Sequence, residues 1–305
     1  MTDNPLDRYL EVDDAAHRRH FLGPFVSIIG LVLLLAGILF STRWLEDSAF
    51  MQRTQCSVIL GSEKYVLAPD QARYAAIIAA AGLNRGLERH EVTIALATAR
   101  QESKIRNISY GDTAGPDSRG LFQQRPSQGW GTQEQVMDPW YAADRFYQEL
   151  ETFPNYHSLS VTEAAQAVQR SAYPDAYARH EQLGTAFARA LTEGEPGALN
   201  CALKPADAAE AELSAKELQT LLGRFGQSIG ETTEVTRDGN VLQLTVSSDQ
   251  NGWRLANWAL ANAQAANVVQ ISYNGLEWNR AKRSWSAGAE NTAATVQITL
   301  DTATR

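Results

Sequence analysis

Two short stretches decide how this chain folds: Arg100-Gln101-Glu102-Ser103, and then Gly120-Leu121-Phe122-Gln123-Gln124. Before Glu102, apolar side chains recur at steps of three and four residues, at Val92, Leu96 and Ala99. This spacing predicts a helix that ends near Glu102. The glycines and the proline between positions 111 and 116 predict a loop, and the second stretch predicts a short buried turn that carries an amide. We therefore expect one carboxyl at a helix end, opposite a loop of hydrogen-bonding groups.

Such a carboxyl suits acid catalysis on a sugar oxygen. Cleavage of a glycosidic bond needs an acid that is still protonated near neutral pH, whereas an exposed Glu has a pKa of about 4.3. Burial against apolar groups can raise that pKa to about 6. Leu121 and Phe122, with the apolar face of the helix, can bury Glu102 in this way. Most glycosidases also use a second carboxylate, for which Asp112 and Asp117 are candidates. Both also fit ordinary turn sequences, which is the alternative interpretation.

The two stretches resemble the catalytic core of the lytic transglycosylase and goose-type lysozyme families. Those families carry a Glu-Ser pair at the end of a core helix, which corresponds to Glu102-Ser103. Their Gly-Leu-Met-Gln-like turn corresponds to residues 120–123, with Phe in place of Met. A third, Tyr-centred motif corresponds to residues 172–177, although Pro174 stands where the families commonly have Asn. The resemblance covers roughly residues 68–195.

The resemblance implies a fold, a substrate and a mechanism. A single Glu, here Glu102, would first protonate the leaving oxygen. Its carboxylate would then take the proton from the muramoyl C6 hydroxyl and close a 1,6-anhydro ring, which cleaves the MurNAc–GlcNAc bond of peptidoglycan. Predicted contacts to the glycan strand are Ser103, Gln123, Gln124, Tyr173 and Tyr177. Two alternatives stay open: a hydrolytic muramidase that uses a second carboxylate, and a non-catalytic peptidoglycan-binding scaffold of a cell-wall-spanning complex.

Composition excludes some other classes of function. The chain has 305 residues and a formal net charge of -8, so it has no basic surplus to neutralise the phosphates of a nucleic acid. Its five histidines are scattered, and the sequence shows no metal-ligand spacing, phosphate loop or dinucleotide fingerprint. We therefore predict no metal site, no cofactor and no nucleic-acid partner.

An uncharged apolar segment at residues 21–42 suggests a membrane span. About 20 helical residues rise roughly 30 Å, which is enough to cross the hydrocarbon core. A cleaved signal peptide fits less well, because a long polar tail precedes the segment and no small-x-small cleavage site follows it. Basic residues at 17–20 place the N-terminus in the cytoplasm and the C-terminal domains outside it. We predict a cytoplasmic tail at 1–20, one transmembrane helix at 21–42 and a juxtamembrane segment at 43–67, in the plasma membrane of a bacterium.

The chain has only two cysteines, Cys56 and Cys201. They bracket the predicted catalytic region, and outside the membrane a disulfide between them can persist. Two unpaired thiols are the alternative.

The remaining sequence predicts further domains. Helical patterns without strand alternation predict an all-α, lysozyme-like domain over 68–195, followed by a linker at 196–212. Residues 213–305 predict a helix and then ββαβββ, a small α+β domain, with hairpin cues at Asp238-Gly239 and Asn274-Gly275. A basic-aromatic cluster in this region suggests a surface for membrane or cell-wall partners, and its members are Trp278, Arg280, Lys282, Arg283 and Trp285. A solvated hairpin edge is the alternative. The predicted fold class is thus multidomain.

Overall fold

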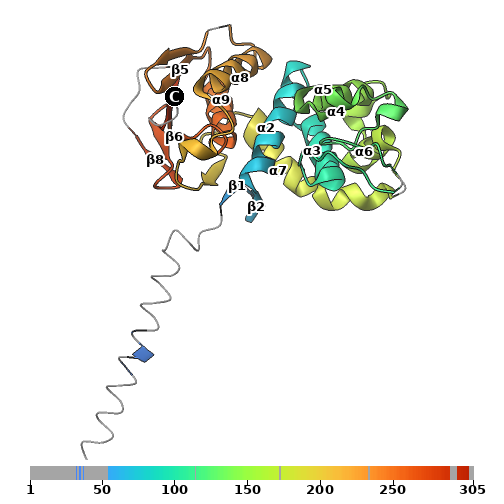
Figure 1. The fold of residues 1–305 in the computed structure, drawn as a ribbon, viewed down its shortest axis with the longest axis horizontal. Helices are drawn as coiled ribbons and strands as arrows, with labels where there is room; N and C mark the ends of the chain where they lie inside the picture. Colours follow the sequence, from blue (N-terminus) through green and yellow to red (C-terminus); the bar gives the residue numbers. More distant parts are fainter. Residues whose placement is uncertain are drawn as a thin grey trace, which may run out of the picture. The chain divides into compact units, whose positions relative to one another are not determined.

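The computed structural model describes residues 54–113, 115–171, 173–232, 234–288 and 294–301, together with Val32, Leu34, Leu35 and Gly37. Residues Thr54–Arg305 form one compact unit. Its helices and strands are arranged as in Figure 1. The predicted cytoplasmic tail at 1–20 lies outside the described residues.

The predicted membrane topology is not supported. No helix in the part of the chain that the structure describes is both long and apolar enough to cross a membrane. A span needs about 20 consecutive apolar helical residues, and the described residues of the 21–42 segment are four exposed helical positions. The remainder of that segment lies outside the described residues. This finding contradicts the prediction of a single-pass protein of the bacterial plasma membrane.

Six α-helices form the region of the unit that carries both motifs. They are α2 (Pro69–Asn84), α3 (Arg89–Ser103), α4 (Gln133–Met137), α5 (Pro139–Leu150), α6 (Val161–Gln169) and α7 (Glu181–Thr192). A 3-10 helix, η3 (Pro174–His180), precedes α7. Helix α3 packs against α7, α6 and η3, so the end of α3 meets the third motif.

Helix α2 is the central element of the unit. Ala75 to Gly82 are buried without interruption, so this alanine-rich helix is covered on every side rather than along one stripe. It packs against α3, α5 and α7 on the side of the motifs, and against α8 (Ala215–Ser228) and α9 (Asp249–Ala261) on the other. The indole of Trp258 in α9 stacks on Phe225 at 5.0 Å between ring centroids. Its Nε1 donates a hydrogen bond to the Ala76 carbonyl at 3.2 Å, which joins α9 to α2.

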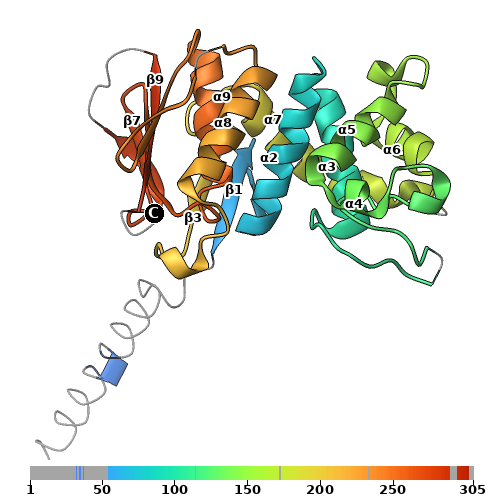
Figure 2. The ribbon, with the colours of Figure 1, turned by 45° about the horizontal axis from the view of Figure 1, so that its top comes forward.

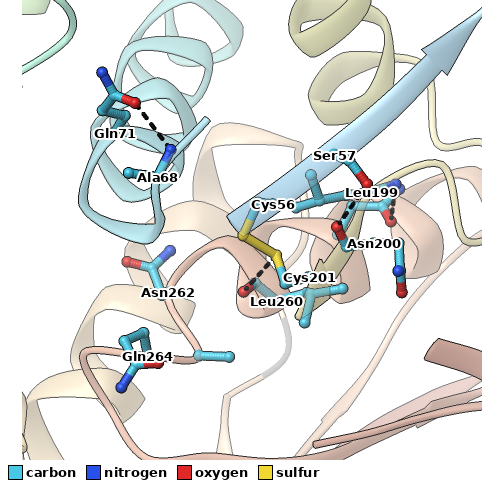
Figure 3. Close-up of a disulfide and its surroundings, with 12 residues drawn as sticks. Cys56, Ser57, Ala68, Gln71, Leu199, Asn200, Cys201, Leu260, Asn262 and Gln264 are labelled. Atoms are coloured by element: carbon cyan, nitrogen blue, oxygen red, sulfur yellow. Dashed lines mark hydrogen bonds between the residues drawn. A yellow bond between two sulfur atoms is a disulfide. The ribbon is translucent and has the colours of Figure 1, made fainter. Parts of the chain in front are cut away.

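A small antiparallel sheet in the order β2-β1-β3 joins distant parts of the chain. Its strands are β1 (Gln55–Leu60), β2 (Glu63–Leu67) and β3 (Asn200–Ala202). Cys56 lies directly opposite Cys201 in the β1–β3 register, and the two form a buried disulfide. Figure 3 shows this disulfide beside Leu260 of α9. The predicted disulfide is confirmed.

The second sheet has six antiparallel strands in the order β4-β5-β9-β6-β7-β8. The strands are β4 (Thr236–Asp238), β5 (Val241–Thr245), β6 (Val268–Tyr273), β7 (Leu276–Asn279), β8 (Ser284–Ala287) and β9 (Thr295–Leu300). Figure 2 shows α8 and α9 between this sheet and α2. Helix α9 packs on β6 and β9, so the sheet's inner face joins the same core.

The predicted fold class is wrong. In place of a transmembrane helix, an all-α domain and a separate α+β domain, the described residues form a mixed α/β fold of eight α-helices and two sheets. Strands β1 and β2 lie in the range 43–67 that was predicted as a juxtamembrane segment, and β3 lies in the predicted linker at 196–212. The burial of α2 explains why the chain does not divide into separate domains. A helix without a solvated face must bury its apolar surface on all sides, and α2 does so against both halves of the chain.

Candidate active site

Glu102 lies in the last turn of α3, and the local backbone turns sharply just beyond it. Lys104 and Ile105 both adopt left-handed conformations, with φ of 57° and 55°. The Ile105 N–H donates to the Ala99 carbonyl at 2.9 Å, which satisfies a carbonyl at the helix end. Ile105 itself is fully buried. This turn ends the helix one residue after Glu102 and leaves its carboxyl half-buried at the helix end.

The carboxyl of Glu102 has a fixed partner from the third motif. The hydroxyl of Tyr177, in η3, donates a hydrogen bond to Oε1 of Glu102 at 2.8 Å. Tyr177 is fully buried, so this hydroxyl is supplied from inside the protein. Burial also raises the pKa of Tyr177 well above its ordinary value, and the Glu102 charge acts in the same direction. The phenol therefore remains protonated and acts as a permanent hydrogen-bond donor to Glu102.

Burial raises the pKa of the Glu102 carboxyl above its ordinary value. The hydrogen bond from Tyr177 lowers this pKa because it stabilises the carboxylate, and the negative charge of Asp112 raises it. Desolvation is the largest of the three effects, so the net shift favours the protonated acid. A carboxyl that keeps its proton to higher pH is what a general acid requires.

Ser103 connects the end of α3 to the second motif. It is buried, and its hydroxyl donates to the Leu121 carbonyl at 2.7 Å and accepts from the Arg106 N–H at 3.1 Å. Ser103 was predicted as a contact to the glycan strand, whereas the structure places its hydroxyl inside the protein. This hydrogen bond joins Leu121 of the Gly-Leu-Phe-Gln turn to Ser103, the residue that follows Glu102.

The turn itself depends on glycine. Gly120 adopts φ of 78°, and a Cβ at this position would lie 2.2 Å from the Val136 carbonyl oxygen. The Gly120 N–H donates to the Ile108 carbonyl at 2.8 Å, which pairs the turn with the chain just after α3. Phe122 is fully buried and stacks on Phe146 of α5, with 4.6 Å between ring centroids. The buried ring of Phe122 therefore anchors the turn to α5.

The two amides predicted to bind substrate differ in position. Gln124 is buried, and its Nε2 donates to the Ala142 carbonyl of α5 at 3.0 Å, so its side chain fixes the turn to α5. Gln123 is half-buried with a left-handed φ of 49°, and its Nε2 lies 3.3 Å from the Gly120 carbonyl. Gln169 of α6, which no sequence motif marks, donates to the Phe122 carbonyl at 3.2 Å. It lies in an alanine-rich helix whose sequence gives no signal for this role.

The two candidate second carboxylates also differ. Asp117 accepts hydrogen bonds from Arg125 Nε at 2.9 Å and from the Ser127 N–H at 3.0 Å. Ser127 and Arg125 hold the pKa of the Asp117 carboxyl far below its usual range. Asp112 accepts a hydrogen bond from the Gly115 N–H at 2.8 Å, and its charge acts on Glu102. Of the two, Asp112 is the one coupled to Glu102.

The two tyrosines of the third motif are separated by the fold. Tyr177 is buried against Glu102, whereas Tyr173 is 76% exposed. A second exposed ring, Tyr110, follows α3 with 67% of its surface accessible, and no sequence motif marks it. Tyr173 therefore presents an exposed ring within the third motif, and Tyr110 presents one after α3.

The predicted basic-aromatic cluster of the C-terminal region is largely internal. The indole nitrogens of Trp278 and Trp285 donate to the carbonyls of Cys201 and Leu199, at 3.1 and 2.8 Å. Arg280 is buried and donates to the Ala263 carbonyl at 3.0 Å. Burial lowers the pKa of Arg280 to about 10. Three of the five members therefore pack the six-stranded sheet against its neighbours.

No model of a known protein family matches the sequence, and no curated protein is significantly similar to it. Within the described ranges, no group of three or more His, Cys, Asp and Glu side chains is arranged to hold a metal ion. We therefore infer the function from the geometry around Glu102.

Proposed function

We propose that this chain cleaves the MurNAc–GlcNAc bond of peptidoglycan glycan strands as a lytic transglycosylase, with Glu102 as acid and then base. One observation carries the proposal: a half-buried carboxyl with a raised pKa accepts a hydrogen bond from a buried tyrosine, beside a glycine-dependent turn. The order of the three motifs along the sequence supports the same function.

The hydrogen bond from Tyr177 assigns separate tasks to the two carboxyl oxygens. Oε1 of Glu102 accepts from the phenol, so Oε2 carries the acidic proton. Transfer of that proton to the glycosidic oxygen breaks its bond to C1 of the muramoyl residue and leaves positive charge on the ring. The Glu102 carboxylate then takes the proton of the C6 hydroxyl, whose oxygen bonds to C1. Glu102 ends the cycle protonated, so no second carboxylate and no water are consumed.

A hydrolytic muramidase is the second candidate, and the coupling between Asp112 and Glu102 favours it. In that reaction an exposed carboxylate activates water, and the oxygen that reaches C1 comes from water rather than from the C6 hydroxyl. Asp112 is exposed, so water can reach its carboxylate.

Mass spectrometry of muropeptides released from purified sacculi by the full chain tests the proposal. We expect products that end in 1,6-anhydro-muramoyl residues, because Glu102 serves both steps alone. Products that end in a reducing sugar, with one water more, would instead identify the muramidase. A chain that binds sacculi and releases no soluble fragment would overturn both and favour a binding scaffold.

Tyr177→Phe should shift the pH dependence of cleavage. The acid acts only when protonated, so the rate falls as pH rises through the pKa of Glu102. The Tyr177 hydrogen bond lowers that pKa, and its loss should move the fall in rate to higher pH. The maximal rate should drop by about 10- to 100-fold, because the carboxyl loses its fixed orientation. Initial rates of muropeptide release across a pH series measure both effects.

Tyr147→Phe is the matched control for this experiment. Tyr147 is also fully buried, and its hydroxyl donates to the Ile78 carbonyl at 3.0 Å, away from Glu102. We expect it to lower stability without moving the pH profile. A Tyr177→Phe profile that coincides with wild type would show that Tyr177 is merely a packing residue.

A further inference from the structure

A cavity of about 530 Å³ lies between the start of α2, the chain just after α3, and the segments around positions 204–212 and 264–265. Its size falls in the range of about 300–1,000 Å³ that small-molecule sites occupy. Neither of the sequence motifs contributes to its lining. It is therefore a different feature from the site at Glu102.

The charged groups of this cavity are arranged in three pairs. Arg73 lies 2.5 Å from Glu212, Arg106 lies 2.7 Å from Asp70, and Lys204 lies 3.7 Å from Glu210. Three cations thus face three carboxylates, and the lining has no formal net charge. Five of the six side chains are 41–66% exposed, and Arg73 is 20% exposed. A ligand can therefore reach these ion pairs and take the place of one partner in a pair.

The composition of the lining selects among ligand classes. A phosphate-rich ligand needs a surplus of cations, which this lining lacks. An apolar ligand would leave the charged groups desolvated. Tyr74 is the one aromatic residue among the lining residues, so the cavity offers little stacking surface for sugar rings. A ligand with both a carboxylate and an ammonium group can bind a cation at one end and a carboxylate at the other, and the net charge of the occupied cavity stays zero. The side chains that it displaces are exposed, so water can hydrate them.

From these observations we propose that the cavity binds a short zwitterionic peptide, with Arg106 and Arg73 at its carboxylate and Glu210 and Glu212 at its ammonium group. Arg106 follows Glu102 by four residues, which span at most about 14 Å. Peptidoglycan carries on its muramoyl residues a peptide stem with free carboxylates and a free amine. Identification of the ligand as this stem rests on the proposed function, whereas the preference for a zwitterionic peptide does not.

Calorimetric titration of the full chain tests the proposal with three probes: the tetrapeptide stem released from peptidoglycan, the same peptide with acetylated amines, and the disaccharide linked to the stem. We expect the free or the glycan-linked stem to bind, and acetylation to weaken binding by about tenfold or more, because the ammonium group is lost. Binding of only the glycan-linked form, weakened by Arg106→Gln, would identify the substrate as the source of the peptide. The same binding without that weakening would overturn the proposal, because the disaccharide then binds outside this cavity.

Arg106→Gln and Glu212→Gln should each weaken binding of the stem by about tenfold. Arg89→Gln is the matched control, because Arg89 pairs with Glu193 at the same 2.7 Å outside this cavity. Absence of binding, indifference to acetylation, or equal losses for Arg106→Gln and Arg89→Gln would overturn the proposal. Glu102→Gln should bind the free stem as wild type does, so a failure of the proposed function is distinguishable from a failure of this site.

Discussion

Glu102→Gln should reduce release of soluble muropeptides by about 10³-fold or more, because the variant has neither the acid nor the base of the proposed reaction. General acid–base catalysis contributes about 10²–10⁴-fold for a positioned side chain. In the proposed reaction the same carboxyl serves both proton transfers. Release of fragments from purified sacculi, followed by liquid chromatography, measures the loss.

The glutamine variant separates chemistry from folding. The amide has the size of the carboxyl, and its oxygen can still accept the hydrogen bond from Tyr177. The raised pKa means that the folded protein holds the proton of Glu102 more tightly than the unfolded chain does. Wild type therefore loses stability as pH rises from the unfolded pKa through the folded one, a loss that the variant avoids. Its free energy of unfolding at neutral pH should match or exceed that of wild type.

Two further measurements complete the comparison. Glu63→Gln replaces an exposed Glu at the start of β2 and should leave cleavage unchanged. Binding of sacculi should persist in Glu102→Gln, because the glutamine removes no contact surface. If this variant cleaved sacculi within tenfold of the wild-type rate, another group would have to supply the proton, and the proposed role of Glu102 would be wrong.

The place of Glu102 could be read from the sequence, but the partners of its carboxyl could not. Apolar periodicity predicts a helix that ends near residue 102, and α3 ends at Ser103. The sequence could not tell which of Tyr173 and Tyr177 faces Glu102, because this depends on the path of η3. Nor could it show that Ser103 and Gln124 use their polar groups inside the protein, since their partners are backbone carbonyls of distant residues.

Local turn chemistry predicted hairpins but not the order of strands. Asn274-Gly275 joins β6 to β7, as the dipeptide indicates. The chain also has a strand, β8, that the predicted ββαβββ order omits. Strand β9 lies between β5 and β6, although it comes last in the sequence. Such long-range pairing depends on which apolar faces meet α8 and α9, and no short-range signal in the sequence carries that information.

The sequence also did not indicate that Thr54–Arg305 forms one compact unit. Composition around positions 193–212 is typical of a linker, yet β3 lies there and pairs with β1. Likewise, Trp258 of α9 makes its hydrogen bond to α2 across 182 positions. Periodicity shows that a helix is apolar, but not that two different layers cover it.

Replacement of both cysteines by alanine should lower the free energy of unfolding by up to about 5 kcal/mol. The disulfide joins residues 145 positions apart, and in the chain-entropy model a loop of this length restricts the unfolded chain by about that amount. The bond is fully buried, so its loss also removes packing beside Leu260. Denaturant unfolding of Cys56→Ala/Cys201→Ala and wild type, followed by circular dichroism, gives the difference.

The control for this variant is wild type unfolded in the presence of a reductant, which should unfold at the same denaturant concentration as the double variant. The effect should be largest on the β1–β3 ladder, because that ladder is short: Gln55, Cys56 and Ser57 face Ala202, Cys201 and Asn200. Three residue pairs contribute little stability when nothing closes the loop between them. Equal stability of the oxidised wild type and the double variant would show instead that packing against the helices fixes β1. In that case the disulfide would add nothing to the compact unit that surrounds Glu102.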